Sequence, residues 1–399
     1  MNTPIRIHSR TPVVQWLFKL KILLIFCFIQ NGYAQRILEK KDRFTSEAAV
    51  YEETKTFADG TSMSGDKVDG VMYITENGTF YRRKVNGDVN VKWFGAKGDG
   101  DRNDLGTDDT SSIQKALTVL EKAFPVYDLT GQNLLGGFTL HFPAGKYLVN
   151  KTFVLPSNCT VSGESYNTTV LHAIKPKFIF TNIGGFYANG IDMIMNSGIT
   201  IKDLTLKQGG ISFQQAVSSR IENVRIMNLF GSGTDTGIAI KLSVDLRIKN
   251  VKVFRSTGYG ILYQETLGGK LSTTTSFENV WVSHCKVGML VDGSDGKIGI
   301  ISSSVNNSIF EYNNIGIQFH GKISNFALRD VHFEQNNVNA IEVDGNVNLV
   351  VDNIFGDEVG ALEISAKRPG DASDRIYLRN FNIPYKVSDK YKGKVILQN

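Results

Sequence analysis

The sequence predicts an all-β protein in which most of the chain forms a parallel β-helix, preceded by a small β segment. The 39 Gly and 8 Pro among 399 residues indicate many tight turns and few rigid linkers. Short stretches of alternating apolar residues recur through the second half of the chain, and a period of two is that of strands. An Asn or Asp also recurs at one position of each repeat, as expected for a turn used once per coil.

Residues 1–34 have the pattern of a signal peptide. Lys19 and Lys21 precede the apolar run 22–29, and the small-residue pattern 32–34 places a cleavage site before Gln35. The run is too short to span a bilayer, which takes about 20 residues in a helix. We therefore expect a protein that is secreted, periplasmic or on the cell surface, without a membrane span.

The charge is nearly balanced once this segment is set aside. The chain holds 44 Lys and Arg against 39 Asp and Glu, and residues 1–34 contain four of the basic residues and no acid. The remainder therefore has 40 basic and 39 acidic residues. Binding to nucleic-acid phosphates needs clustered positive charge, so we expect no nucleic-acid partner.

Residues 35–88 predict a small N-terminal β segment. The stretch 72–81, with Asn77 and Gly78 at its centre, is typical of a hairpin with a two-residue turn. Residues 79–83 continue it as a strand that we expect to be exposed. This segment serves either for attachment or oligomerisation, or only for packing on the first coil.

The following residues predict a helix that covers the open end of the β-helix and hides its strand edges. Residues 108–111 offer N-cap side chains, and Ser111 with Gln114 fits a capping box. We interpret Asp99, Asp108 and Asp109 as turn and cap residues rather than as metal ligands. One helix face is apolar and consists of Ile113, Ala116, Leu117 and Leu120.

The β-helix prediction depends on a repeat of the form apolar-x-Asn/Asp-apolar-x-apolar. Between its copies recurs a small residue followed by apolar-x-apolar, as in Gly260–Tyr263. Strands this short bury an apolar face only when each coil stacks on the next, and we expect the Asn/Asp side chains to form a structural ladder. The Asn/Asp positions are 203, 223, 250, 279, 307, 330, 353 and 380.

Cys159 and Cys285 are the two cysteines outside the signal peptide. They are 126 residues apart, or about five coils. At about 4.8 Å per coil this separation is too large for a disulfide. We expect two buried free thiols.

Four phrases at the start of the repeat carry a family resemblance. Phe94–Gly100 reads Phe-Gly-Ala-Lys-Gly-Asp-Gly, and Thr107–Thr110, Ile113–Leu117 and Phe142–Tyr147 follow it. With these phrases the chain resembles the pectate lyase superfamily, specifically its rhamnogalacturonase and epimerase-like branch, which is related to polygalacturonases of glycoside hydrolase family 28 and to phage tailspikes. The resemblance implies a right-handed single-stranded parallel β-helix, here residues 89–399, that acts on or holds polysaccharide.

Polygalacturonases carry three signatures in successive coils, namely Asn-Thr-Asp, Asp-Asp and Gly-His-Gly. This chain echoes the first signature at 233–237, so the resemblance gives Asp235 as a candidate catalytic acid, with a turn residue as the alternative. The corresponding positions of the next two coils, 257–259 and 285–287, hold neither an acidic pair nor Gly-His-Gly.

Strand alternation predicts a different site. If Val291 faces inward, Asp292 faces outward, and His320 and Asp344 face outward on the next two coils. The two aspartates would then lie about 9.6 Å apart, near the upper limit for the carboxylates of inverting glycosidases, with His320 placed to relay a proton. The alternative is that all three are turn residues before glycine. Two more outward residues, Gln318 and Glu342, complete this candidate sugar-binding face.

We therefore expect an exported carbohydrate-active protein that hydrolyses glycosidic bonds of an acidic or complex polysaccharide. One alternative is a glycan-binding or tailspike-like structural β-helix without catalysis, which the missing hydrolase signatures favour. Another is a polysaccharide lyase, in which Arg255 or Lys286 removes a proton while calcium neutralises the uronate. Tyr259 is a candidate for stacking on a sugar ring.

Cofactor motifs are absent from the sequence. It contains neither a phosphate-binding glycine loop between a strand and a helix nor a metal-binding spacing of Cys and His. We expect no cofactor, apart from calcium if the protein is a lyase. The expected partner is a polysaccharide, and the expected oligomeric state is a monomer or a homotrimer.

Overall fold

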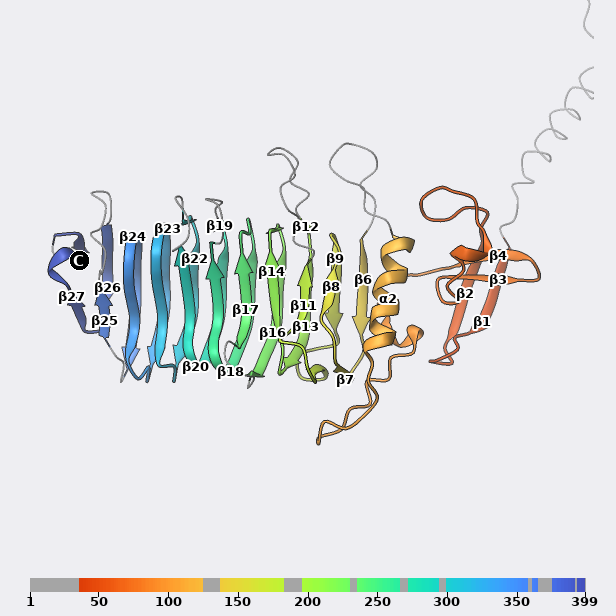
Figure 1. Cartoon of the computed structure of the whole chain (residues 1–399), viewed down its shortest axis with the longest axis horizontal. Helices are drawn as coiled ribbons and strands as arrows, with labels where there is room; N and C mark the ends of the chain where they lie inside the picture. Colours follow the sequence, from red (N-terminus) through yellow and green to blue (C-terminus); the bar gives the residue numbers. More distant parts are fainter. Residues whose placement is uncertain are drawn as a thin grey trace, which may run out of the picture.

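The computed structural model describes residues 36–124, 137–182, 196–229, 235–265, 272–293, 299–357, 361–364, 375–391 and 393–398. A small antiparallel sheet and a long stack of parallel strands follow each other along the longest axis of the molecule (Figure 1). The predicted signal peptide lies outside the described residues. No helix in the described ranges combines the length and the apolar character needed to cross a membrane.

The antiparallel sheet has four strands in the order β1-β2-β4-β3. Its hairpin is confirmed: Glu76 pairs with Thr79 across a two-residue turn, and both turn residues have positive φ, 50° at Asn77 and 77° at Gly78. The expectation of an exposed strand at 79–83 is wrong, because β4 lies between two strands and buries Tyr81 and Arg83. The strands are β1 (Ile37–Lys41), β2 (Ala48–Glu53), β3 (Tyr73–Glu76) and β4 (Thr79–Arg83), and the 3-10 helix η1 is Gly65–Lys67.

Arg83 joins this sheet to the start of the parallel stack. Its Nη1 lies 2.7 Å from Asp42 Oδ2, and both side chains are almost fully buried. The guanidinium also lies 3.6 Å from the ring centre of Trp93, in the 3-10 helix η2 (Val91–Phe94), and Trp93 Nε1 donates to Glu47 at 3.2 Å. A cation on an aromatic face is attractive, and burial strengthens that attraction.

The predicted capping helix is α2 (Thr110–Ala123), which lies between the antiparallel sheet and β6 (Figure 1). All four expected apolar residues are buried on its inner face. The capping-box prediction is wrong because Asp109, not Ser111, is the N-cap residue. The Asp109 carboxylate instead accepts backbone N–H groups of Lys97 and Gly98, at 2.6 and 3.0 Å, and so fixes the loop before the helix.

The parallel stack is a β-helix in which one strand of each coil pairs with its equivalent in the next. Its strands are β5 (Val89–Asn90), β6 (Phe138–Phe142), β7 (Gly145–Val149), β8 (Phe153–Leu155), β9 (Cys159–Gly163), β10 (Thr169–Ala173), β11 (Phe178–Asn182), β13 (Thr200–Lys207), β14 (Gly210–Gln214), β16 (Arg220–Leu229), β17 (Thr236–Lys241), β18 (Arg247–Gln264), β20 (Ser276–Gly293), β22 (Ser304–Glu311), β23 (Ile315–Glu334), β24 (Asn339–Asp357), β25 (Ala361–Ile364), β26 (Arg375–Phe381), β27 (Tyr385–Val387) and β28 (Val395–Gln398). Shorter elements are β12 (Asn196–Ser197), β15 (Ala216–Val217), β19 (Ser272–Thr273), β21 (Ile300–Ile301) and η3 (Asp389–Tyr391).

The sequence repeat and the coil coincide. The first apolar residues of all eight copies pair in one unbroken row that runs from Ile201 to Leu378. These side chains are buried in a continuous apolar interior. The predicted parallel β-helix is thus confirmed, and the stacking supplies the burial that one short strand cannot provide.

The Asn/Asp ladder is also confirmed. All eight residues have positive φ, between 42° and 59°, a conformation that Asn and Asp tolerate better than most residues. Their side chains bond from coil to coil: Nδ2 of Asn250 donates to Asn223 Oδ1 at 3.0 Å, and Nδ2 of Asn279 donates to Asn250 Oδ1 at 2.7 Å. The ladder residues therefore suit the left-handed backbone at this turn, and their side-chain amides find hydrogen-bond partners on the neighbouring coils.

The two cysteines are buried and unpaired, as expected. Burial raises the pKa of both thiols, in the case of Cys285 to about 12. Both side chains belong to the apolar interior.

Candidate functional site

Most of the predicted site residues lie on the outer side of one parallel sheet of the stack. We call this surface the candidate face. Its segments pair in parallel, so that equivalent side chains form rows along the long axis of the molecule. The segments are 236–241 of β17, 259–264 of β18, 287–292 of β20, 315–320 of β23, 339–344 of β24 and 361–364 of β25.

Asp292, His320 and Asp344 occupy one row of the candidate face. Asp292 pairs with His320, and His320 pairs with Asp344, on three successive coils. His320 and Asp344 lie inside β23 and β24, which continue beyond them, whereas Asp292 is the last residue but one of β20. At about 4.8 Å per coil, the two aspartates are about 9.6 Å apart at the backbone.

His320 is held by Asp292. The Nδ1 atom of His320 lies 3.1 Å from Asp292 Oδ1, and Gln264 Nε2 donates to the other carboxylate oxygen, also at 3.1 Å. The His320 side chain is 43% exposed, whereas that of Asp292 is 15% exposed. A neutral imidazole whose Nδ1–H points at a carboxylate has its lone pair on Nε2, and that lone pair can accept a proton.

A second polar row runs beside the first. Gln318, Glu342 and Glu363 are equivalent residues on three coils, and Gln318 Nε2 donates to Glu342 Oε1 at 2.9 Å. The buried Asn339 lies between the two glutamates, with its Nδ2 at 3.4 Å from Glu342 Oε2 and 3.3 Å from Glu363 Oε2. Two carboxylates one coil apart therefore share one amide donor.

Asp235 does not join these rows. It precedes β17, whereas Lys241 at the far end of β17 shares the row of Asp292, so about 20 Å along the strand direction separates Asp235 from that row. Thr257 Oγ1 donates to its carboxylate at 2.7 Å, and its carbonyl oxygen accepts from Tyr259 N at 2.9 Å. This is the geometry of a residue that connects two coils.

Tyr259, Lys286 and Arg255 lie on the same side of the candidate face as Asp235. Tyr259 is half-buried at the start of its segment. Lys286 is exposed just before β20 enters the face, and Arg255 is exposed at the preceding corner with a φ of 61°. The nine predicted residues thus divide into a polar group around Asp292 and a more cationic group near the opposite edge.

Two residues of the face were not predicted, Gln264 and Asn339. Gln264 follows Gly260 by four residues, just as Asp292 follows Gly288, and His320 follows Gly316, by four. Aligning the copies on that glycine would have placed Gln264 beside Asp292. No sequence pattern indicates Asn339, because its role depends on the direction in which its side chain points.

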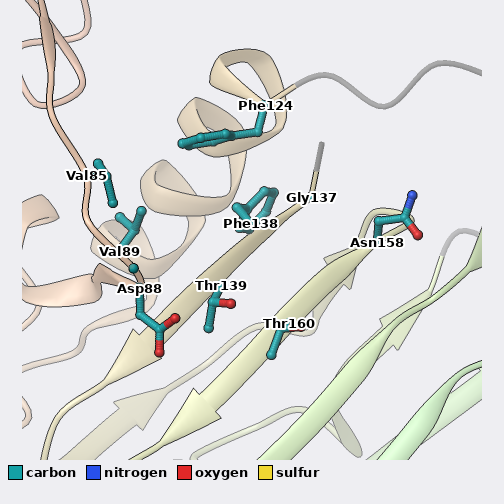
Figure 2. Close-up of a pocket in the computed structure, with 10 residues that line it drawn as sticks. Val85, Asp88, Val89, Phe124, Gly137, Phe138, Thr139, Asn158 and Thr160 are labelled. Carbon is teal, nitrogen blue, oxygen red and sulfur yellow. The ribbon is translucent and has the colours of Figure 1, made fainter. Parts of the chain in front are cut away.

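A hollow at the other end of the stack contains none of the predicted residues. It has a volume of about 380 Å³ and lies where the linker after β4 meets the end of α2 and strands β6 and β9. Figure 2 shows the rings of Phe124 and Phe138 near one another, with the polar side chains of Asp88, Thr139 and Thr160 below them. Its lining carries one carboxylate and no base, so the chemistry of the candidate face has no counterpart there.

Comparison with known proteins shows which family the parallel stack matches. Residues 88–363 match the family described as rhamnogalacturonase A/epimerase, pectate lyase-like. The chain is also similar to the pre-neck appendage protein of Bacillus phage B103, with 26% identity over 290 residues that cover 70% of this chain and 27% of the phage protein. The chain spans only between a fifth and about a quarter of the curated relatives that it matches.

Solved structures give two further likenesses. The ORF18 protein of Geobacillus virus E2 has 16% identity and a TM-score of 0.49, and the match covers 91% of this chain and 73% of that one. An alginate lyase from a Paenibacillus species has 14% identity and a TM-score of 0.49, and the match covers 72% of this chain and 96% of the lyase.

Proposed function

The chain belongs to the rhamnogalacturonase A/epimerase, pectate lyase-like family, and we propose that it binds an acidic or complex polysaccharide across the candidate face and hydrolyses its glycosidic bonds there. The observation that carries this proposal is the row formed by Asp292, His320 and Asp344, which we call the catalytic row. In this row Asp292 orients the imidazole of His320. The family is one of carbohydrate-active β-helix proteins, and the row supplies acid and base groups on such a surface.

The proposed reaction is a direct displacement by water. His320, oriented by Asp292, accepts a proton from a water molecule through Nε2, and the water oxygen attacks the anomeric carbon. The bond from that carbon to the glycosidic oxygen breaks, and Asp344 supplies the proton to the leaving oxygen. The two aspartates lie about 9.6 Å apart at the backbone, just above the 6.5–9.5 Å between the carboxylates of inverting glycosidases, whereas the base His320 and the acid Asp344 lie one coil, about 4.8 Å, apart at the backbone.

Two further observations bear on the substrate. Arg255 and Lys286 are exposed near one edge of the face, where they suit the carboxylates of uronic-acid residues. Gln318 and Glu342 lie between that edge and the catalytic row, and together they offer both hydrogen-bond donors and acceptors to sugar hydroxyls.

A second candidate function is glycan binding without cleavage. The similarity to a phage pre-neck appendage protein favours it, because such a name describes a structural part of a virion. In this case the antiparallel sheet of residues 36–84 would connect the β-helix to another part of an assembly, and the protein would form oligomers such as a homotrimer.

The first experiment is to incubate the purified protein with pectic, other uronic-acid and neutral polysaccharides. New reducing ends without ultraviolet absorbance of unsaturated products would support hydrolysis. Unsaturated products would instead indicate a lyase reaction. Repeating the assay with calcium and with a chelator would then show whether the reaction requires a metal. Binding of a glycan without any product would favour the second candidate.

Two substitutions test the assignment of the site. Asp292→Asn and Asp344→Asn should each abolish most of the cleavage while glycan binding is retained. The matched control is Asp352→Asn, a half-buried aspartate of β24 outside the candidate face. Cleavage by the Asp292→Asn variant at the wild-type rate would reject the proposed site.

A further inference from the structure

The corner before the candidate face carries an unusual set of side chains. At this corner each coil turns from the preceding sheet into the candidate face, and one residue per coil takes a positive φ between 46° and 61°. We call these equivalent residues the corner row. They are Gln208, Asn228, Arg255, His284, Tyr312 and Gln335.

The corner conformation does not explain the choice of residue. Asn and His tolerate a left-handed backbone better than most residues, as at Asn228, whereas large side chains such as those of Arg and Tyr adopt it rarely and at a cost. The corner row nevertheless places Arg255 and Tyr312 there, with φ values of 61° and 54°, on the coils before and after His284. Unfavourable backbone angles that persist on a surface point to a function of the side chain.

His284 and Tyr312 form an exposed aromatic pair. Their ring centres are 5.0 Å apart with an angle of 25° between the planes, which matches the rise of about 4.8 Å between coils. His284 Nδ1 is hydrogen-bonded to Ser283 Oγ, which fixes the orientation of the imidazole. His284 is exposed and Tyr312 is 40% exposed, so the stacked pair presents aromatic surface to solvent, of the kind that packs against the C–H groups of a sugar ring.

Two positively charged side chains lie near His284. Arg255 precedes His284 by one coil in the corner row, and Lys286 follows His284 by two residues on the same strand. Both side chains are exposed, and in the described part of the chain neither forms an ion pair with a carboxylate. An aromatic surface beside uncompensated cations suits a ring that carries a carboxylate.

The corner row is parallel to the catalytic row. His284 and Asp292 are eight residues apart on β20, and Tyr312 and His320 have the same spacing one coil further on. The corner therefore borders the candidate face over the same coils that hold the catalytic row.

We propose that Arg255, His284 and Tyr312 form a binding subsite for a uronic-acid residue of the polysaccharide. The sugar ring packs against the exposed surface of the His284–Tyr312 pair, and the guanidinium of Arg255 donates to the sugar carboxylate. This inference rests on the proposed function, because the bound residue belongs to the same chain that is cleaved at His320. Its role is affinity and selection of acidic glycans, not bond cleavage.

Two substitutions separate the contribution of the aromatic rings to binding from the cost of the backbone strain. His284→Asn and Tyr312→Asn remove each ring and install a residue that prefers the left-handed conformation, so Tm should stay the same or rise. Affinity for hexamers of galacturonic, mannuronic or glucuronic acid, measured by calorimetry, should fall about tenfold for the best of these ligands. Unchanged affinity in both variants overturns the subsite, and so does failure of the wild-type protein to bind any of the three hexamers.

The charge contact needs its own comparison. Arg255→Gln should weaken binding of the acidic hexamer and leave binding of its methyl ester unchanged, because the ester has no carboxylate. Arg247→Gln is the matched control, since Arg247 is an exposed arginine at the start of the same strand, β18. Equal losses for both hexamers in the Arg255 variant would reject the contact.

Failure of the subsite and failure of the catalytic proposal give different results. If the ring variants bind normally but Asp292→Asn abolishes cleavage, the subsite is wrong and the proposed function stands. If the ring variants lose affinity but the wild-type protein releases no product, the subsite stands and the protein binds glycans without cleaving them.

Discussion

His320 Nδ1 lies 3.1 Å from Asp292 Oδ1, although the two residues are 28 positions apart in the sequence. The contact exists because β20 and β23 stack in exact register, which brings equivalent positions of neighbouring coils to the same place. The half-buried carboxylate fixes the more exposed imidazole, and the proposed chemistry depends on this difference in exposure.

Replacement of His320 should therefore affect catalysis far more than folding. We expect His320→Gln to lower kcat by about 100-fold to 10,000-fold, the usual contribution of general acid–base catalysis, with Tm little changed because the side chain is 43% exposed. Initial rates of reducing-end release measure the first effect, and thermal unfolding measures the second. A variant with wild-type kcat would show that His320 transfers no proton.

The Asn ladder should be more sensitive to Ala than to Gly. Asn250 donates to Asn223 and accepts from Asn279, and its φ is 53°. Asn250→Ala loses these bonds and also places an ordinary side chain in a left-handed conformation, for a total cost of about 2 kcal/mol. Asn250→Gly loses only the bonds and should cost about 1 kcal/mol, which urea unfolding can resolve. Equal costs would contradict a conformational role for the ladder.

The buried pair of Asp42 and Arg83 should matter more than a surface pair on the same sheet. Arg83→Met leaves the Asp42 carboxylate buried without its partner and should destabilise the antiparallel sheet by about 3–5 kcal/mol. Lys84→Met is the matched control, because Lys84 pairs with Glu52 at the surface and its loss should cost under about 1 kcal/mol. Trp93 fluorescence reports the unfolding of this region, since Arg83 lies on the Trp93 ring.

The pH dependence of this sheet follows from the same pair. Burial acts to raise the pKa of Asp42, but the hydrogen bonds from Arg83 and from the backbone of Thr45 and Phe44 outweigh it and hold the pKa below the ordinary 3.8. A carboxyl group with a lowered folded pKa stabilises the fold above its unfolded pKa, and this contribution disappears as the pH falls. The sheet should therefore lose stability below about pH 4, and Asp42→Asn should remove that dependence.

A second ion cluster should hold the loop before α2. Asp104 lies against Nζ of Lys146 and of Lys207 and against Nδ1 of the buried His172, at 3.0 Å from the last. Burial acts to raise the Asp104 pKa, but hydrogen bonds from the two lysines dominate and lower it to about 2. By the same sign rule, the cluster should be complete above about pH 4 and lost as the pH falls towards 2.

Hydrogen exchange of the loop is the direct measurement of this cluster. Asp104→Asn should speed the exchange of backbone amides in residues 99–108 at neutral pH. Asp101→Asn should have a smaller effect, because Lys146 contacts only the backbone oxygen of Asp101 and the amide oxygen of Asn can still accept from the backbone N–H groups of Asn103 and Leu105. The same exchange rate in the Asp104 variant and the wild-type protein would mean that the cluster does not hold the loop.

Much of the site could be predicted, because strand alternation determines which face of the sheet each sequence position occupies. Asp292, His320 and Asp344 follow the glycine or alanine of their copies by four residues, so the period of two places them outward and the repeat places them in one row. The turn alternative does not hold for His320 and Asp344, because β23 and β24 continue through the following glycine, whereas β20 ends at Gly293, directly after Asp292.

Other parts could not be predicted from the sequence, because they depend on contacts between distant residues. The buried partner of Arg83 is Asp42, 41 positions earlier, and no local pattern joins them. The capping box at Ser111 and Gln114 satisfied a local rule, but Asp109 competes for the N-cap position and uses its carboxylate for Lys97 and Gly98 instead.

The sequence by itself determined the coil, its apolar interior and the Asn/Asp ladder, because these features repeat and each copy obeys the same steric and hydrophobic rules. The tertiary structure alone decided which polar residues meet. The spacing between copies varies, so the contacts from Gln264 to Asp292, from Asn339 to two glutamates and from His284 to Tyr312 are fixed only when the coils stack at a distance of about 4.8 Å.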